Sequence, residues 1–227
     1  MKTPPLLAVF IALSVVHLAA VLFQWQPGMY LTKPLLLTTL AIWFFMQTKN
    51  HPSKFSRFVL AGLVCSIAGD TFLMFGKEIY FLLGLGSFLL AHICYITAFT
   101  LFPGFKSGAV RRQPLLTLPF LLFLFLINRS LWNDLPVAFV VPVLAYSATI
   151  TLMALSSLNM ARRVKKFTGM VLLWGALLFV LSDTMIAFER FKAIGLPPVF
   201  MRFSIMATYL AGQFLLAKGG ILANSEN

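Results

Sequence analysis

Eight long runs of apolar residues, separated by short polar segments, constrain this chain more than any other feature of its sequence. Most runs are 16 to 22 residues long, enough to cross the hydrocarbon core of a bilayer as an α-helix. Their apolar residues are continuous rather than alternating, which argues against the strands of a membrane barrel. The runs occupy Leu6–Phe23, Leu31–Met46, Phe58–Phe75, Phe81–Phe102, Leu115–Ile127, Pro136–Ser156, Thr168–Phe188 and Phe200–Ala217. The sequence therefore predicts an all-α polytopic membrane protein, with eight transmembrane helices in one bundle.

The composition excludes a soluble domain of this length. Of the 227 residues, 60% are hydrophobic and only 11% are charged, whereas soluble domains carry about 25% charged residues. The connections between runs are short, so we expect residues 1–227 to form a single transmembrane domain. The first run also resembles a cleavable signal peptide, but His17 inside it and the charge distribution described next favour a retained helix.

The net charge of +12 is distributed unevenly between the two sides that eight spans define. The side of both termini carries 12 basic residues: Lys2, Lys49, Lys54, Arg57, Lys106, Arg111, Arg112, Arg162, Arg163, Lys165, Lys166 and Lys218. The other side carries six: Lys33, Lys77, Arg129, Arg190, Lys192 and Arg202. The positive-inside rule then places both termini in the cytoplasm and favours a bacterial inner (plasma) membrane. Topology explains the charge without a nucleic-acid partner; a site for anionic lipid or nucleic acid at 162–166 is the alternative.

Two acidic residues lie inside apolar runs, in similar settings. Asp70 occurs in GDTFLMF and Asp183 in SDTMIAF. Both spans run outward from the cytoplasm, and we expect each acid five or six residues before the end of its helix, at similar depth. A charged acid there costs about 1–3 kcal/mol, so intramembrane acids normally face the bundle interior and mark a site. The alternative is that each acid holds helices together through hydrogen bonds with Lys33 or Arg202.

The two acids are 113 positions apart, which is half the length of the chain. The same offset relates Gly62 to Gly175, Thr71 to Thr184, Phe75 to Phe188 and Lys77 to Arg190. A four-plus-four duplication would explain these matches. Chance is the alternative, since the chain contains 24 phenylalanines.

Other polar residues fall at helical spacing within the runs. They are Ser66 in the third span, His92 and Tyr95 in the fourth, Tyr146 in the sixth, and Tyr209 and Gln213 in the eighth. Each alone is also typical of hydrogen bonding between helices. Together they predict a polar cavity among apolar helices.

Metal and nucleotide chemistry find little support in the sequence. His17, His92, Asp70 and Asp183 could supply zinc ligands, but the chain has no HExxH motif or paired-histidine spacing. It also lacks GxSxG, a P-loop and a GxGxxG motif after a strand. We therefore expect no metal and no other cofactor.

An ordered set of short motifs resembles the YhhN-type lysoplasmalogenase family. The motifs are KP at 33–34, SxxGDxxL at 66–73, GxxxFxxxHxxY at 84–95, SDTxxA at 182–187 and YxxxQ at 209–213. Their order through most of the chain carries the resemblance. It implies an eight-helix enzyme that hydrolyses the vinyl ether bond of lysoplasmalogens, such as the ethanolamine and choline forms. The products would be a fatty aldehyde and a glycerophospho-base.

This chemistry suits the two intramembrane acids. Vinyl ether hydrolysis begins with protonation of the carbon beta to oxygen, and water attacks the resulting oxocarbenium ion. One protonated carboxylic acid and one carboxylate can serve these steps. We expect Asp70 and Asp183 to be that catalytic pair, without deciding which is the acid. The expected substrate-binding residues are Lys33, Ser66, His92, Tyr95, Tyr146, Ser182, Arg190, Tyr209 and Gln213. Lys33 or Arg190 would hold the lipid phosphate.

Two other classes of protein remain open at this point. A small proton-coupled transporter also places acids and repeats in the membrane, but it should carry charges or helix breaks in both halves of the bilayer. A structural membrane subunit has no evident use for two acids at one depth. The expected partners are accordingly a lysophospholipid substrate and the lipid bilayer.

Overall fold

The computed structural model describes residues 5–104, 107–192 and 195–226 of the chain. Within these ranges the chain forms nine α-helices and one 3₁₀ helix, and no strand. The elements are α1 Pro5–Leu22, α2 Gln26–Thr48, α3 Lys54–Leu73, α4 Glu78–Leu101, α5 Ala109–Arg112, η2 Pro114–Thr117, α6 Leu118–Leu131, α7 Val137–Ala161, α8 Lys166–Phe191 and α9 Pro198–Asn224. The prediction of an all-α fold is confirmed.

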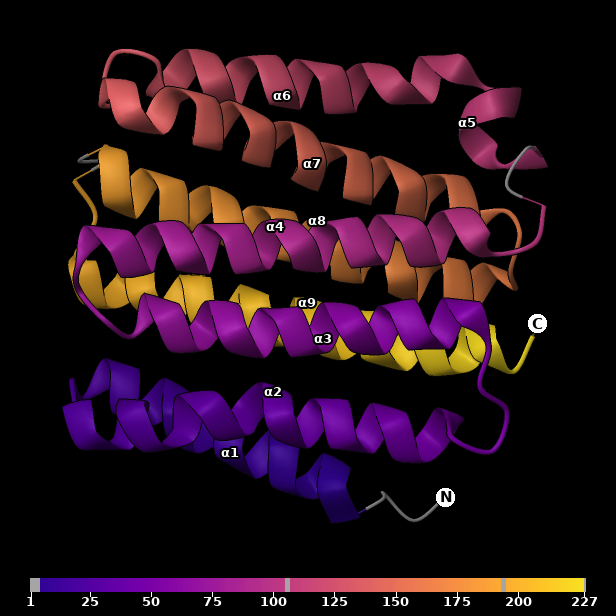
Figure 1. Ribbon diagram of the computed structural model, residues 1–227, viewed down its shortest axis with the longest axis horizontal. Helices are drawn as coiled ribbons and strands as arrows, with labels where there is room; N and C mark the ends of the chain where they lie inside the picture. Colours follow the sequence, from indigo (N-terminus) through magenta and orange to yellow (C-terminus); the bar gives the residue numbers. More distant parts are fainter. Residues whose placement is uncertain (1–4, 105–106, 193–194, 227) are drawn as a thin grey trace.

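The long helices lie side by side in one bundle (Figure 1). Helices α3, α4, α8 and α9 form its centre, with α1 and α2 on one flank and α6 and α7 on the other. Helix α1 begins and α9 ends at the same end of the bundle, as an even number of spans requires. The connections α2–α3, α4–α5 and α7–α8 lie at that end as well.

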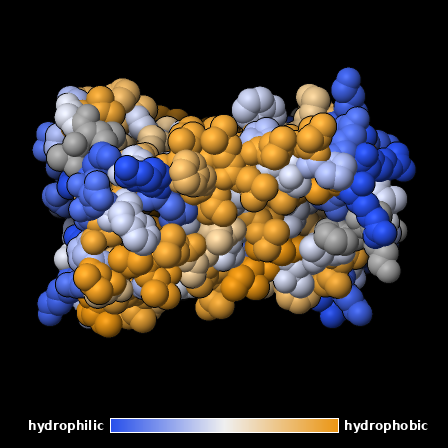
Figure 2. Space-filling model, turned by 90° about the horizontal axis from the view of Figure 1, so that it is seen from above, coloured by the Kyte–Doolittle hydropathy of each residue, from blue (hydrophilic) through white to orange (hydrophobic). Residues whose placement is uncertain are grey.

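Eight segments are long and apolar enough to cross a membrane, in agreement with the eight predicted runs. The fifth is continuous through η2 and α6, over Pro114–Leu131. Large apolar side chains such as Leu121 and Trp174 are exposed on the outside of the bundle. Figure 2 shows a broad apolar band around the middle and polar residues gathered at the two ends. The protein is an integral, multi-pass membrane protein.

Local signals explain where the helices begin and end. The Ser53 hydroxyl accepts a hydrogen bond from the backbone N–H of Ser56, and the Ser56 side chain returns the bond, so a capping box starts α3. After α4, Gly104 adopts a φ of 79°, a left-handed conformation that glycine adopts without strain. Pro197 directly precedes α9.

Two helix pairs make the closest contacts of the bundle, α3 with α4 and α8 with α9. Gly175 lets α8 approach α9, because a Cβ there would lie 2.8 Å from the backbone nitrogen of Leu216. Its counterpart at the offset of 113, Gly62, faces the ring of Tyr95 in α4. Gly175 thus meets backbone of α9 and Gly62 meets a side chain of α4, and the four-plus-four duplication stays a prediction.

The two acids do not lie at matching distances from their helix ends. Asp70 is three residues before the end of α3, whereas Asp183 is eight residues before the end of α8. The expectation that each acid lies five or six residues before the end of its helix is therefore wrong for both acids. At the offset of 113, Gly76 corresponds to Glu189. Glycine is a poor helix former and lies in the turn after α3, while glutamate continues α8.

The basic segment between α7 and α8 has a structural role. The Arg163 guanidinium donates hydrogen bonds of 2.6 Å to the carbonyl oxygens of Phe99 and Phe102, at the carboxyl end of α4. The backbone N–H of Lys165 donates to Glu226 near the end of the chain. These contacts favour topology and helix capping over a nucleic-acid site. Lys2 and Lys106 of the predicted basic side lie outside the described residues.

Candidate active site

A polar cavity of about 580 Å³ lies among α1, α2, α3, α8 and α9. Its lining includes Gln26 and Gly76 near the α1–α2 and α3–α4 connections, so it reaches the end of the bundle away from the termini. Its polar side chains are His17, Gln26, Tyr30, Lys33, Asp70, Ser182, Glu189, Arg190, Arg202 and Tyr209. The predicted polar cavity is therefore present.

Basic side chains dominate the charge of this polar cavity. Arg202 Nε lies 3.0 Å from Glu189 Oε1 in an ion pair. Lys33 and Arg190 have no such ion pair among the described residues. The Arg190 guanidinium lies 5.0 Å from the ring centroid of Phe81. Two cations outside the ion pairs of the described residues make the cavity suited to an anionic group such as a phosphate.

Asp70 belongs to the polar cavity and is 4% exposed. The hydroxyl of Tyr209 in α9 donates a 2.7 Å hydrogen bond to its Oδ2. Nearby, the hydroxyl of Thr32 donates to the carbonyl of Gly28 at 2.7 Å. The hydroxyl oxygen of Thr32 therefore accepts a hydrogen bond from Nδ1 of His17, also at 2.7 Å. Helix α1 thus contributes a polar side chain to the cavity wall.

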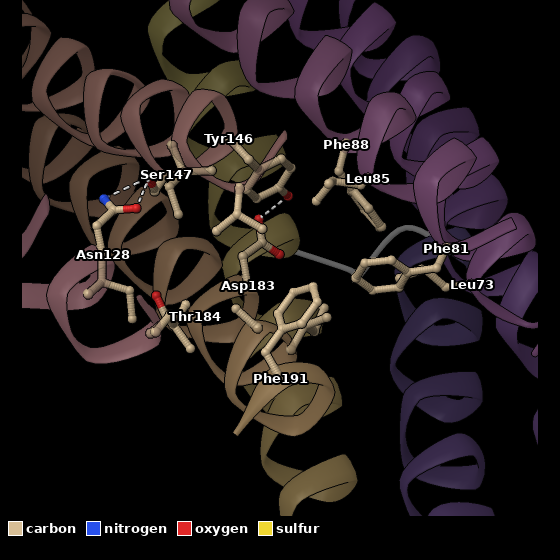
Figure 3. Close-up of a pocket in the computed structure, with 16 residues that line it drawn as sticks. Leu73, Phe81, Leu85, Phe88, Asn128, Tyr146, Ser147, Asp183, Thr184 and Phe191 are labelled. Carbon is tan, nitrogen blue, oxygen red and sulfur yellow. Dashed lines mark hydrogen bonds between the residues drawn. The ribbon is translucent and has the colours of Figure 1, made fainter. Parts of the chain in front are cut away.

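Asp183 belongs to a second, apolar pocket of about 50 Å³ between α4, α6, α7 and α8. Tyr146 Oη donates to Asp183 Oδ2 at 2.6 Å, and His92 Nε2 lies 2.9 Å from the same oxygen. Because the tyrosine proton is directed to the carboxyl group, we assign the second donor to the Nε2–H of His92. Asp183 Oδ1 is buried and has no hydrogen-bond partner among the described residues. Figure 3 shows this oxygen turned away from Tyr146, toward Phe81.

The polar cavity and the apolar pocket share a wall. Leu73, Phe81, Phe88 and Ile186 line both of them. Behind this wall, the Phe179 ring contacts the rings of His92 and Tyr209 at centroid distances of 4.6 and 5.4 Å. The two carboxyl groups are thus in adjacent compartments of different polarity, one with many polar side chains in its lining and one lined mainly by apolar side chains.

Three predicted substrate-binding residues form a separate buried network. Tyr95 Oη donates to Gln213 Oε1 at 2.8 Å, and Gln213 Nε2 donates to Ser66 Oγ at 2.9 Å. Among the described residues, the lining of neither compartment includes these three side chains. Their hydrogen bonds connect α3, α4 and α9, so this geometry favours a role in helix packing.

The structure places the other predicted site residues at one of the two compartments. Lys33, Ser182, Arg190 and Tyr209 line the polar cavity, and Tyr146 lines the apolar pocket. His92 contacts the Asp183 carboxyl group. The alternative was that Lys33 or Arg202 holds the two acids through hydrogen bonds. The structure shows other partners: Tyr209 for Asp70, and Tyr146 and His92 for Asp183.

Some residues that line the two compartments were not predicted from the sequence. Glu189 lies in the last turn of α8 and lines the polar cavity. Asn128 Nδ2 donates to Ser147 Oγ at 2.9 Å beside the apolar pocket. Asn128 is the one amide in the apolar run of α6, a signal that would have identified it.

Metal binding has no evident site in the described part of the chain. No group of three or more histidine, cysteine, aspartate or glutamate side chains there is arranged to hold an ion. The site offers two carboxyl groups, their tyrosine and histidine partners, and the cations of the polar cavity.

Comparison with known proteins agrees with the motif resemblance. The chain is 32% identical to lysoplasmalogenase TMEM86A of Bos taurus over 195 residues, covering 82% of this chain and 75% of that protein. It is 31% identical to lysoplasmalogenase TMEM86B of Mus musculus over 194 residues, covering 85% and 74%. No solved structure matches the chain. The model of the YhhN family matches residues 28–220, and the chain therefore belongs to the YhhN family.

Proposed function

We propose that this protein is a lysoplasmalogenase, a membrane hydrolase that cleaves the vinyl ether bond of a lysoplasmalogen to a fatty aldehyde and a glycerophospho-base. The names of its relatives support this activity. The observation that carries it is the pair of adjacent compartments, each with a buried carboxyl group. A lysophospholipid has a matching division into a charged head and an apolar chain.

The polar cavity suits the head of such a lipid. Its free cations, Lys33 and Arg190, can neutralise the phosphate. Ser182 and Tyr209 line the same cavity and can contact the glycerol hydroxyl groups. The cavity opens toward the end of the bundle opposite the termini, so a substrate in that leaflet reaches it without crossing the membrane.

Asp70 and Asp183 form the catalytic pair. One supplies a proton to the vinyl ether, and the other stabilises the resulting cation and receives a proton from water. Burial among apolar side chains excludes most water, which strengthens the interaction of a carboxylate with a developing positive charge. The reaction uses water as the only other reactant.

The bundle is expected in a bacterial inner membrane, with both termini in the cytoplasm. The excess of basic residues at the terminal end of the bundle supports this orientation. The polar cavity then faces the outer leaflet. The partners are the lysophospholipid substrate and the surrounding bilayer.

A proton-coupled transporter finds less support. Both compartments that contain the acids share one wall, and the polar one opens toward a single end of the bundle. Alternating access instead requires a path to each side in turn. The relatives reported above carry the name of an enzyme.

The test is aldehyde release by the purified protein in detergent. Lysoplasmenylethanolamine is compared with two lysophospholipids of equal chain length, one with an ester and one with a saturated ether at the same position. Aldehyde from the vinyl ether lipid alone supports the proposal. No aldehyde from it, with protein that still shows cooperative thermal unfolding, contradicts the proposal.

A further inference from the structure

We infer that Asp183 is the acid that protonates the vinyl ether and that Asp70 is the carboxylate that meets the water. This assignment rests on the proposed function and adds the role of each acid. Its basis is the opposite polarity of the two compartments, since Asp183 lines the apolar pocket and Asp70 lines the polar cavity.

The polarity of the compartments fixes the direction of the substrate. The phosphate and glycerol belong in the polar cavity, with Lys33 and Arg190, and the part of the hydrocarbon chain next to the vinyl ether belongs in the apolar pocket. The vinyl ether joins these two parts, so it lies across the wall that Leu73 and Phe88 help to form. Its two carbons then differ in their surroundings. The carbon bonded to oxygen is on the polar side, and the next carbon is on the chain side.

This direction identifies the proton donor, because the chain-side carbon of a vinyl ether is the carbon that is protonated. Asp183 is the carboxyl group of the apolar pocket. Its Oδ2 already accepts from Tyr146 and His92, so the transferable proton belongs on Oδ1. That oxygen has no partner in the described structure and turns toward Phe81 of the shared wall (Figure 3). Tyr146 and His92 are positioning residues that fix its orientation.

The same direction assigns the other carboxyl group. Water attacks the oxygen-bearing carbon, which lies toward the polar cavity. That cavity, of about 580 Å³, has polar side chains that can hydrogen-bond to water, whereas the apolar pocket is lined mainly by side chains that cannot. Asp70 lines the cavity, and Tyr209 holds its Oδ2. Asp70 is therefore placed to stabilise the positive charge and to accept the proton of the attacking water.

The proton balance closes over three steps. Asp183 gives its proton to the chain-side carbon, the π electrons form the new C–H bond, and an oxocarbenium ion results. A water oxygen bonds to the cationic carbon and passes one proton to Asp70, which gives a hemiacetal. The bond to the glycerol oxygen then breaks, and Asp70 returns its proton to that oxygen. The hemiacetal hydroxyl becomes the aldehyde and its proton restores Asp183.

The stereochemistry of protonation tests this assignment. In D₂O the chain-side carbon gains one deuteron, and a donor fixed on one face gives a single configuration. Aldehyde formed by the full-length protein is reduced at once to the alcohol, and its enantiomeric ratio is measured for the wild type, Asp70→Asn and Asp183→Asn. Binding of a saturated ether lysophospholipid, followed by thermal shift, checks that each variant keeps its fold.

We expect one enantiomer in large excess from the wild type and from the residual activity of Asp70→Asn. We expect near-equal amounts from Asp183→Asn, or no product. The reverse pattern, the same ratio from both variants, or no product from Asp70→Asn overturns the assignment. An inactive wild type overturns the proposed function itself, so the two failures are distinguishable.

Discussion

Asp70 and Tyr209 are 139 positions apart in the chain, and a 2.7 Å hydrogen bond joins them. The bond links α3 to α9. On the other side of the shared wall, a bond of 2.9 Å links His92 of α4 to Asp183 of α8. Each central helix pair thus provides one acid and the partner of the other acid. The two halves of the site depend on each other for their geometry.

Loss of either acid should lower turnover sharply without loss of the fold. For Asp70→Asn and Asp183→Asn we expect kcat to fall by about 10²–10⁴-fold, since each removes a group that transfers protons. Asparagine has nearly the same shape, so binding of a saturated ether analogue should persist. Aldehyde release and analogue binding are measured on the same preparations. Asp134→Asn, at an acid outside the two compartments, serves as the matched control.

Removal of the hydroxyl groups that hold the acids should lower kcat more than it raises KM. Tyr146→Phe and Tyr209→Phe each delete one donor to a carboxyl oxygen. Hydrogen bonds to a charged group contribute about 1.5–3 kcal/mol, and Asp183 becomes a carboxylate as it gives up its proton, so we expect kcat to fall roughly 10- to 100-fold in both variants. Tyr80→Phe is the control, because the described structure shows no hydrogen bond from the Tyr80 hydroxyl. Equal effects in all three variants would contradict a role in positioning.

Neutralisation of the free cations in the polar cavity should weaken substrate binding. For Lys33→Met or Arg190→Met we expect KM to rise by roughly 10-fold or more, because each removes a charged partner of the phosphate. The loss should be smaller at high salt, where the cation is already screened. Lys49→Met, at the opposite end of the bundle, should leave KM unchanged. Steady-state kinetics at two salt concentrations measure the KM of each variant and test this prediction.

A larger side chain in the apolar pocket should impair reaction of long chains. Ala187 lines this pocket, whereas Leu181 of the same helix is 47% exposed on the outside of the bundle. Ala187→Phe should raise KM for a lipid with a long alkenyl chain more than for one with a short chain. Leu181→Phe should change neither value. Similar KM ratios in the two variants would exclude this pocket as the chain site.

The close contact of α8 and α9 should make one glycine costly to replace. A Cβ at Gly175 would lie 2.8 Å from a backbone nitrogen of α9, so Gly175→Ala should destabilise the protein by about 1–3 kcal/mol. Gly86, within α4, would place its Cβ in open space. Gly86→Ala should therefore be neutral or slightly stabilising, because alanine favours helix. Thermal unfolding in detergent compares the two variants.

The family motifs identified residues more reliably than they identified contacts. They included His92 and Tyr209, each of which contacts one of the two acids, but not Tyr146, which donates to Asp183. They also included Ser66, Tyr95 and Gln213, whose bonds join helices away from both compartments. Polar residues of both kinds recur at helical spacing inside apolar runs. Spacing alone therefore does not separate a residue that lines a cavity from one that packs between helices.

The sequence by itself determined the eight spans, the membrane setting and the burial of two acids. Bilayer thickness fixes the length of an apolar helix, and this constraint acts locally along the chain. Only the tertiary structure decided that Asp70 and Asp183 lie in compartments of opposite polarity. That division depends on which helices become neighbours, and in a membrane this follows from close contacts such as that of Gly175 with α9. Such contacts join residues far apart in the chain, so no local pattern contains them.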